Sequence, residues 1–217
     1  TLRNSGPLVN LSEAMARVPG LVVANRNNYA QDLQISSRGF GARAGFGVRG
    51  LRLYNDGIPA TMPDGQGQVA HFDLASAERI EVLRGPFSVL YGNSSGGVIA
   101  LFSAPVRAAR AEAGADLGSF GLRQWRASAQ APLGHGLDLR VNLSTMRFDG
   151  FRPQSEAERE LANVRLGWQG EHDTLVFLGS DHNQEAQDPL GLTPADFAAD
   201  PRQTFADALS ANYNTRK

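Results

Sequence analysis

The sequence contains no cysteine among its 217 residues, and this absence removes several classes of site at once. Without thiols the chain forms no disulfide, holds no metal through thiolates and uses no cysteine nucleophile. Its four histidines are scattered and none stands in an H-E-x-x-H pattern, so we predict no metal site. Strong charge of either sign is also missing: the net charge is −1, which gives no bias toward nucleic acid.

Long apolar runs are missing as well. No segment approaches the ~20 residues that a membrane-spanning helix needs, and no signal-peptide pattern opens at Thr1. A membrane-spanning β-strand needs only about 9–11 alternating residues, so the lack of such runs leaves a transmembrane barrel open. The 24 glycines favour many turns.

What the chain does contain is a distinctive stretch over residues 78–99, which begins with an alternating run and breaks at Gly85-Pro86. A plain strand–turn–strand unit is its simplest interpretation. In order, we predict a strand, a helical turn, a sharp glycine bend and a second strand over residues 80–84, 87–91, 92–97 and 98–102.

The residues before this stretch predict short elements joined by polar loops. Apolar residues on one helical face predict a helix over 11–18, which Pro19-Gly20 ends. Residues 45–50 match the dinucleotide pattern G-x-G-x-x-G, which requires a helix directly afterwards. Here residues 51–54 lead instead to Asn55-Asp56-Gly57, a hairpin-turn signal, so we reject a nucleotide site.

The second half of the chain alternates apolar and polar residues with a period of two. We predict strands over residues 111–117, 124–131, 137–144, 162–169 and 175–182. A soluble antiparallel sheet and a barrel wall both fit this pattern. Charged residues on the polar face of successive strands, and connections that alternate between short and long (149–160 and 183–204), favour the barrel.

No set of residues indicates catalysis. The sequence shows no Ser/His/Asp spacing, and Glu78 and Glu81 would point to opposite faces of a strand. We therefore predict that the chain is not an enzyme and has no cofactor.

Residues 78–99 closely resemble the signature of the plug domain of TonB-dependent outer-membrane receptors: an E-x-L-R-G-P strand, an aromatic–glycine turn and a G-G-V-I strand. The same order of motifs continues upstream, in L-x-x-A…V-P-G at 11–20, S-R-G-F at 37–40 and L-Y-N-D-G-I-P at 53–59. Residues 47–68 are similar to the receptor subfamily for pyrroloquinoline quinone. Receptors of the ferric-citrate and other siderophore types share much of that run.

The resemblance implies a mainly β fold. We expect a small α+β plug domain over 1–105 and, over 106–217, the first antiparallel strands of an incomplete 22-stranded transmembrane β-barrel. The chain would then be a piece of a receptor that takes up a small organic ligand across the outer membrane of a Gram-negative bacterium. In that mechanism the plug occludes the barrel until TonB acts.

Several partners follow from the same resemblance. We expect TonB, with its ExbB–ExbD motor, to act on the full-length protein. The sequence that starts at Thr1 does not show the family's short TonB-contact segment, so we do not assign TonB binding to these residues. Lipid and lipopolysaccharide would surround the barrel, a small molecule would bind the plug, and no nucleic acid is expected. The rival from another class is a soluble β-rich binding module.

The resemblance also assigns residues. Arg38 and Arg84 match the family's arginines that pair with barrel glutamates and hold the plug, a role that suits the planar guanidinium. Residues 41–49 should face the periplasm, which leaves Arg43 and Arg49 out of the ligand site. The expected ligand contacts at the plug apex are Arg26, Asn27, Asn28, Tyr29, Asp64, Gln66 and Gln68.

Overall fold

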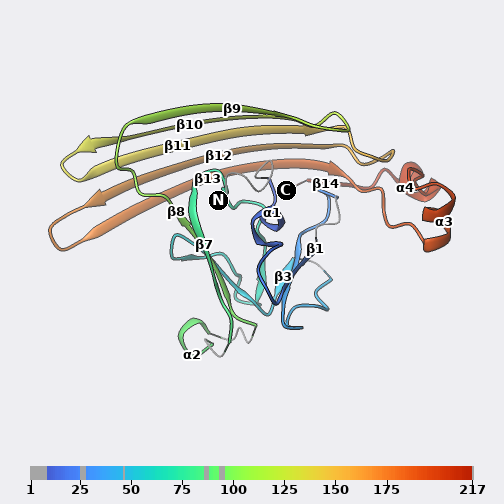
Figure 1. Cartoon of the computed structure of the whole chain (residues 1–217), viewed down its shortest axis with the longest axis horizontal. Helices are drawn as coiled ribbons and strands as arrows, with labels where there is room; N and C mark the ends of the chain where they lie inside the picture. The colour runs from blue at the N-terminus through green and yellow to red at the C-terminus, as the bar shows by residue number, and fades with distance from the viewer. Residues whose placement is uncertain (1–8, 25–27, 46, 86–87, 93–95, 217) are drawn as a thin grey trace. The chain divides into compact units, whose positions relative to one another are not determined.

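The computed structural model describes residues 9–24, 28–45, 47–85, 88–92 and 96–216 (Figure 1). The chain divides into two compact units. The first comprises Thr1–Asn27 with Asp32–Pro105, and the second comprises Asn28–Gln31 with Val106–Lys217. The four residues 28–31, which lie inside the expected plug domain along the sequence, thus pack with the second unit.

The first unit consists of short strands and two short helices. Over the described residues its strands form three sheets, ordered β1-β2, β3-β6 and β5-β4-β8-β7. The elements are α1 (Leu11–Met15), β1 (Leu21–Ala24), β2 (Gln34–Ser37), β3 (Val48–Arg49), β4 (Arg52–Asn55), β5 (Ile58–Pro59), β6 (Gln66–Gly67), β7 (Ala77–Leu83), α2 (Ser88–Tyr91) and β8 (Val98–Ser103).

Helix α1 begins where the sequence supplies a capping box. The Asn10 side chain accepts from the Ser12 N–H at 3.1 Å, and the Glu13 carboxylate accepts from the Asn10 N–H at 3.0 Å. These bonds satisfy N–H groups that have no partner inside the helix. The helix ends at Met15, three residues earlier than the apolar pattern predicts, because the chain already turns before Pro19-Gly20.

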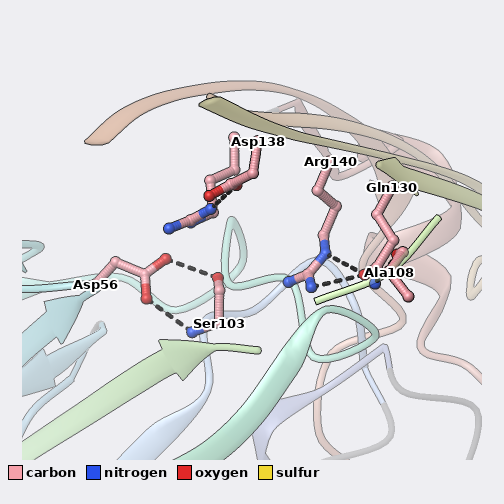
Figure 2. A network of polar contacts seen from close by, with 7 residues as sticks. Asp56, Ser103, Ala108, Gln130, Asp138 and Arg140 are labelled. Atoms are coloured by element: carbon pink, nitrogen blue, oxygen red, sulfur yellow. Dashed lines mark hydrogen bonds and ion pairs between the residues drawn. The ribbon is translucent and has the colours of Figure 1, made fainter. Parts of the chain in front are cut away.

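Strand β8 lies at the centre of the largest sheet of this unit. It pairs parallel with β4 and antiparallel with β7, so its residues Val98–Leu101 are buried. Its far end is fixed by Asp56, in the turn between β4 and β5. The Asp56 carboxylate accepts from the Ser103 N–H at 2.7 Å and from the Ser103 hydroxyl at 2.6 Å (Figure 2).

The predicted strand, helical turn and returning strand around residue 85 are confirmed as β7, α2 and β8. The predicted hairpin after residues 45–50 is also confirmed, because strand β4 follows that run and turns at Asn55-Asp56-Gly57 into β5, where a nucleotide site would need a helix. Residues 86, 87 and 93–95 lie outside the described residues.

The second unit is an antiparallel sheet of long strands joined in chain order, drawn as neighbouring arrows in Figure 1. All five predicted strands are present and each is extended at one end or both. The elements are β9 (Arg110–Leu117), β10 (Arg123–Gly134), β11 (Leu137–Phe148), β12 (Ala157–Gln169), β13 (Thr174–Gln187), α3 (Pro194–Ala199), α4 (Ala206–Ala211) and β14 (Asn214–Arg216).

The two faces of this sheet differ as the period-two pattern requires. One face exposes large apolar side chains, among them Trp125 at 60% and Phe177 at 62%. The other carries polar groups that bond across strands. Figure 2 shows the Arg140 guanidinium donating to the Gln130 side-chain oxygen, with N–O distances of 2.8 and 3.1 Å. The expected mainly β fold, with antiparallel strands after a small α+β unit, is therefore confirmed.

The connections alternate in length, but the second long one differs from the prediction. Strand β13 continues to Gln187 rather than ending near 182, and residues 188–213 then form a loop with helices α3 and α4. The Thr193 side chain caps α3 by accepting from the Asp196 N–H at 3.2 Å. Across the described ranges, no helix has the length and apolar character required to cross a membrane.

Replacing Gly97 by alanine is expected to destabilise the first unit by at least about 1–3 kcal/mol. Gly97 has a φ of +115°, and a Cβ there would lie 2.1 Å from the Leu83 carbonyl oxygen, where β7 ends beside the start of β8. Amide hydrogen exchange along β8 measures the effect. Gly45→Ala is the control, because its added Cβ meets nothing within 4 Å. Equal protection of β8 in both variants would contradict the prediction.

Candidate functional site

The expected ligand residues fall into two groups, one in each unit. Asp64, Gln66 and Gln68 belong to the first unit, whereas Asn28 and Tyr29 belong to the second. Arg26 and Asn27 lie outside the described residues, so their expected roles stay predictions.

In the first unit, Asp64 and Gln66 surround an arginine. The two-residue strands β3 and β6 place Arg49 directly opposite Gln66. The Arg49 guanidinium donates to the Gln66 side-chain oxygen at 3.0 Å and lies 3.8 Å from the Asp64 carboxylate. Asp64 also accepts from the Gln66 N–H at 2.9 Å, which shapes the turn. The pairing of β3 with β6 thus brings Arg49 beside an expected ligand residue, and the expectation that residues 41–49 face the periplasm stays a prediction.

This arginine cluster is open to solvent. The side chains of Arg49 and Asp64 are 52% and 56% exposed, and ion pairs of that kind contribute little to stability. The guanidinium can therefore exchange these partners for an anionic ligand at small cost. Gln68 is held more firmly, since its amide donates to the Asp32 carboxylate at 3.3 Å in a partly buried position.

In the second unit, residues 28–31 form a compact segment bound to β13 and the residue after it. The Asn28 and Gln31 amides both donate to the Asp188 carboxylate, at 2.8 and 3.0 Å. The Gln184 amide donates to the Tyr29 carbonyl at 2.6 Å, and the Tyr29 ring packs edge-on against Phe148 with centroids 5.6 Å apart.

Beside this segment, Arg152 organises the long loop 188–213. Its guanidinium donates to the backbone carbonyls of Gln203 at 2.7 Å, Leu190 at 2.8 Å and Pro189 at 3.0 Å. Burial lowers the pKa of Arg152 from its ordinary value, and the nearby Asp188 carboxylate opposes that shift. The Thr204 hydroxyl also donates to the Pro153 carbonyl at 2.8 Å, so hydrogen bonds join the loop 149–156 to the loop 188–213.

The two arginines expected to hold the plug flank one turn of the first unit. Arg84 donates to the Pro19 carbonyl, and the Arg38 N–H donates to the Gly20 carbonyl at 3.0 Å. Arg38 has a φ of +49°, which is unusual for a residue other than glycine. Within the described part of the chain neither side chain makes an ion pair, and the expected glutamate partners stay a prediction.

Sequence reasoning missed four residues that build the site: Gln31, Arg152, Gln184 and Asp188. Asp188 lies 160 and 157 residues from the two amides it binds, so no local pattern could have paired them. Arg152 had a weak signal, as a cation within a turn-rich loop. Within the second unit, these residues together with Asn28 and Tyr29 offer amide donors, a carboxylate, a guanidinium group and one phenol ring. Among the described residues, no three acidic or histidine side chains gather as metal ligands would.

Comparison with known proteins defines the class of the first half. Residues 1–98 match the family described as the TonB-dependent receptor plug domain, so this part of the chain is a plug domain of that kind.

Particular relatives extend beyond the plug. The chain is 31% identical over 140 residues to the metal-pseudopaline receptor CntO of Pseudomonas aeruginosa, covering 61% of this chain and 20% of that protein. It is 30% identical over 223 residues to the vitamin B12 transporter BtuB of Photobacterium profundum, covering 96% and 35%. The chain thus spans only about a third or less of these curated relatives.

Solved structures show the same fold. The unliganded ferric citrate transporter FecA superposes with a TM-score of 0.73 at 22% identity, covering 88% of this chain and 31% of that one. The copper transporter OprC gives a TM-score of 0.66 at 20% identity, covering 83% and 29%.

Changing Arg152 to lysine is expected to loosen the loop 188–213, because a single ammonium cannot span the three carbonyls that the guanidinium reaches. Chymotrypsin cleavage after Phe197, which is 62% exposed, should become on the order of tenfold faster. Arg202→Lys is the matched control, since Arg202 stacks on Phe151 at 5.3 Å. Equal cleavage rates in the two variants would count against the clamp.

Proposed function

We propose that this chain is the plug and first wall strands of an outer-membrane receptor that takes up a small organic ligand by TonB-dependent transport. The observation that carries the proposal is the succession of a plug domain over residues 1–98 and an antiparallel sheet with one exposed apolar face. The curated relatives are named as a receptor and a transporter, which supports the same class.

The apolar face supports a location in a membrane. Side chains such as Trp125, Leu143 and Phe177 are exposed by half or more on one side of the sheet. A sheet face that exposes several large apolar side chains is typical of contact with lipid or another apolar partner. The proposed environment is the outer membrane of a Gram-negative bacterium, with lipid and lipopolysaccharide around the wall.

In this proposal TonB, driven by ExbB–ExbD, acts on the plug and opens a path for the ligand. Arg38 and Arg84 both lie at the turn around Pro19-Gly20, where paired glutamates of a completed wall would hold the same part of the plug. The chain is then part of a transporter and not an enzyme, in line with a sequence that has no catalytic pattern.

The proposed ligand is pyrroloquinoline quinone, a planar molecule with three carboxyl groups. It is supported by the run 47–68 and by the groups that surround Gln66. In the first unit, the exposed Arg49 guanidinium matches a carboxylate, and the amide of Gln66 matches a further oxygen. In the second unit, taken by itself, the Asn28 amide and the Tyr29 ring would suit the same kind of ligand.

A metal chelate is the second candidate. It is favoured by the names of similar proteins, since CntO is a metal-pseudopaline receptor and FecA transports ferric citrate. An iron–citrate complex is also anionic and would use the same guanidinium and amide donors.

Isothermal titration calorimetry on the full-length receptor in detergent tests both ligands, with pyrroloquinoline quinone as the titrant and ferric citrate as the comparison. Gln66→Ala is expected to weaken binding of the quinone about 3- to 10-fold, the effect of one or two hydrogen bonds. Gln169→Ala is the matched control. It removes an exposed amide whose oxygen accepts from Thr174 at 2.8 Å, at the end of β12.

The outcomes separate the parts of the proposal. Heat from ferric citrate alone would keep the transporter and replace the ligand. Equal affinities of the Gln66 and Gln169 variants would move the ligand away from β6. If neither compound binds, both proposed ligands are excluded.

A further inference from the structure

Asp188, which directly follows β13, forms hydrogen bonds through both its side chain and its backbone. One carboxylate oxygen accepts from the Asn28 amide at 2.8 Å and from the Leu190 N–H at 2.9 Å, and the other accepts from the Gln31 amide at 3.0 Å. The Asp188 N–H donates to the Tyr213 carbonyl at 2.8 Å. The half-buried carboxylate therefore joins a segment near residue 30 to the start of the loop 188–213, and the backbone N–H of the same residue contacts the end of that loop.

The segment is already shaped to meet this carboxylate. The Asn28 side-chain oxygen accepts from the Ala30 N–H at 2.9 Å, a local turn that leaves its amide to donate to Asp188. Two further contacts hold the segment, from Gln184 to the Tyr29 carbonyl and from Phe148 to the Tyr29 ring. The position of Asn28 and Tyr29 thus depends on β13 and on the residue that follows it.

The loop depends on the same carboxylate through Leu190. This residue has a φ of +57°, a conformation that a leucine adopts only when its surroundings impose it. Asp188 accepts from its N–H, and Arg152 donates to its carbonyl at 2.8 Å. Release of Asp188 would leave one of the two bonds that hold this backbone.

We propose that Asp188 is a positioning residue that presents Asn28 and Tyr29 to the ligand and couples their segment to the loop 188–213. The ligand part of this inference rests on the proposed function, whereas the coupling does not. Through this link, displacement of the segment loosens the loop, and loosening of the loop frees the segment.

A carboxylate is required because all three of its partners are donors. Bonds to an ionised acceptor are stronger than those between neutral groups. In Asp188→Asn the negative charge is lost, and the new NH₂ group faces at least one N–H donor where an acceptor is needed. The substitution changes hardly any volume, so its effect reports the hydrogen bonds rather than packing.

Hydrogen–deuterium exchange on the full-length receptor in detergent, without ligand, tests the coupling. In Asp188→Asn, peptides that cover residues 28–31 and 188–205 should both exchange on the order of tenfold faster. Asp200→Asn is the matched control in the same loop, because the Asp200 carboxylate accepts from the nearby Arg202 N–H at 2.8 Å and so makes a local contact within the loop. Unchanged exchange of 28–31 in Asp188→Asn would overturn the proposal.

A swap of donor and acceptor separates positioning from general destabilisation. Combining Asp188→Asn with Asn28→Asp lets the new amide at 188 donate to a new carboxylate at 28, which still accepts from the Ala30 N–H. Exchange of residues 28–31 should then return part of the way to the original rate, while the loop stays faster because the Leu190 N–H keeps no acceptor. Additive effects of the two changes would overturn the pairing.

Titration of the same variants with pyrroloquinoline quinone and with ferric citrate tests the ligand part. Asp188→Asn should weaken whichever compound binds by about 3- to 10-fold, whereas Asp200→Asn should not. Faster exchange with unchanged affinity would overturn the ligand part and keep the coupling. If the unsubstituted receptor binds neither compound, the proposed function fails, and the exchange data still decide the coupling.

Discussion

Strand β8 must form backbone hydrogen bonds along both of its edges, and this constraint organises the first unit. Its residues Val98–Leu101 are a continuous apolar run, as expected of a strand that is covered on both faces. Gly97 lets the strand start against the end of β7, and the Asp56–Ser103 bonds fix its other end. Both ends of the central strand of this unit are therefore fixed.

The second unit is built on a different principle. Its strands alternate apolar and polar residues, so no strand is buried on both faces, and order comes from long ladders between neighbours. Beyond the ends of the ladders, the side chains of Arg152 and Asp188 hold the loop 188–213 through hydrogen bonds to its backbone groups. The polar residues beyond the strand ends thus hold one another in place through hydrogen bonds. A ligand that bound there would contact groups that are already positioned.

The strength of these contacts matters for the transport that we propose. A plug has to be held firmly enough to block a path and loosely enough to be moved. In the first unit the Arg49 cluster is exposed and weakly held, whereas the segment 28–31 is bound through three amides and an aromatic contact. The two groups of expected ligand residues therefore differ in how readily they can rearrange.

The sequence by itself determined the features that have a local cause. The capping box at Asn10, the Asn55-Asp56-Gly57 turn and the period-two strands were all predictable, because neighbouring residues dictate them. Helix α3 also has a local signal in Thr193-Pro194, within the residues predicted as a long connection. Only the tertiary structure decided that Asp188 binds Asn28 across 160 residues and that Arg49 lies beside Gln66. Periodicity reports which side chains are covered, but hydrogen bonds between distant polar groups leave no period in the sequence.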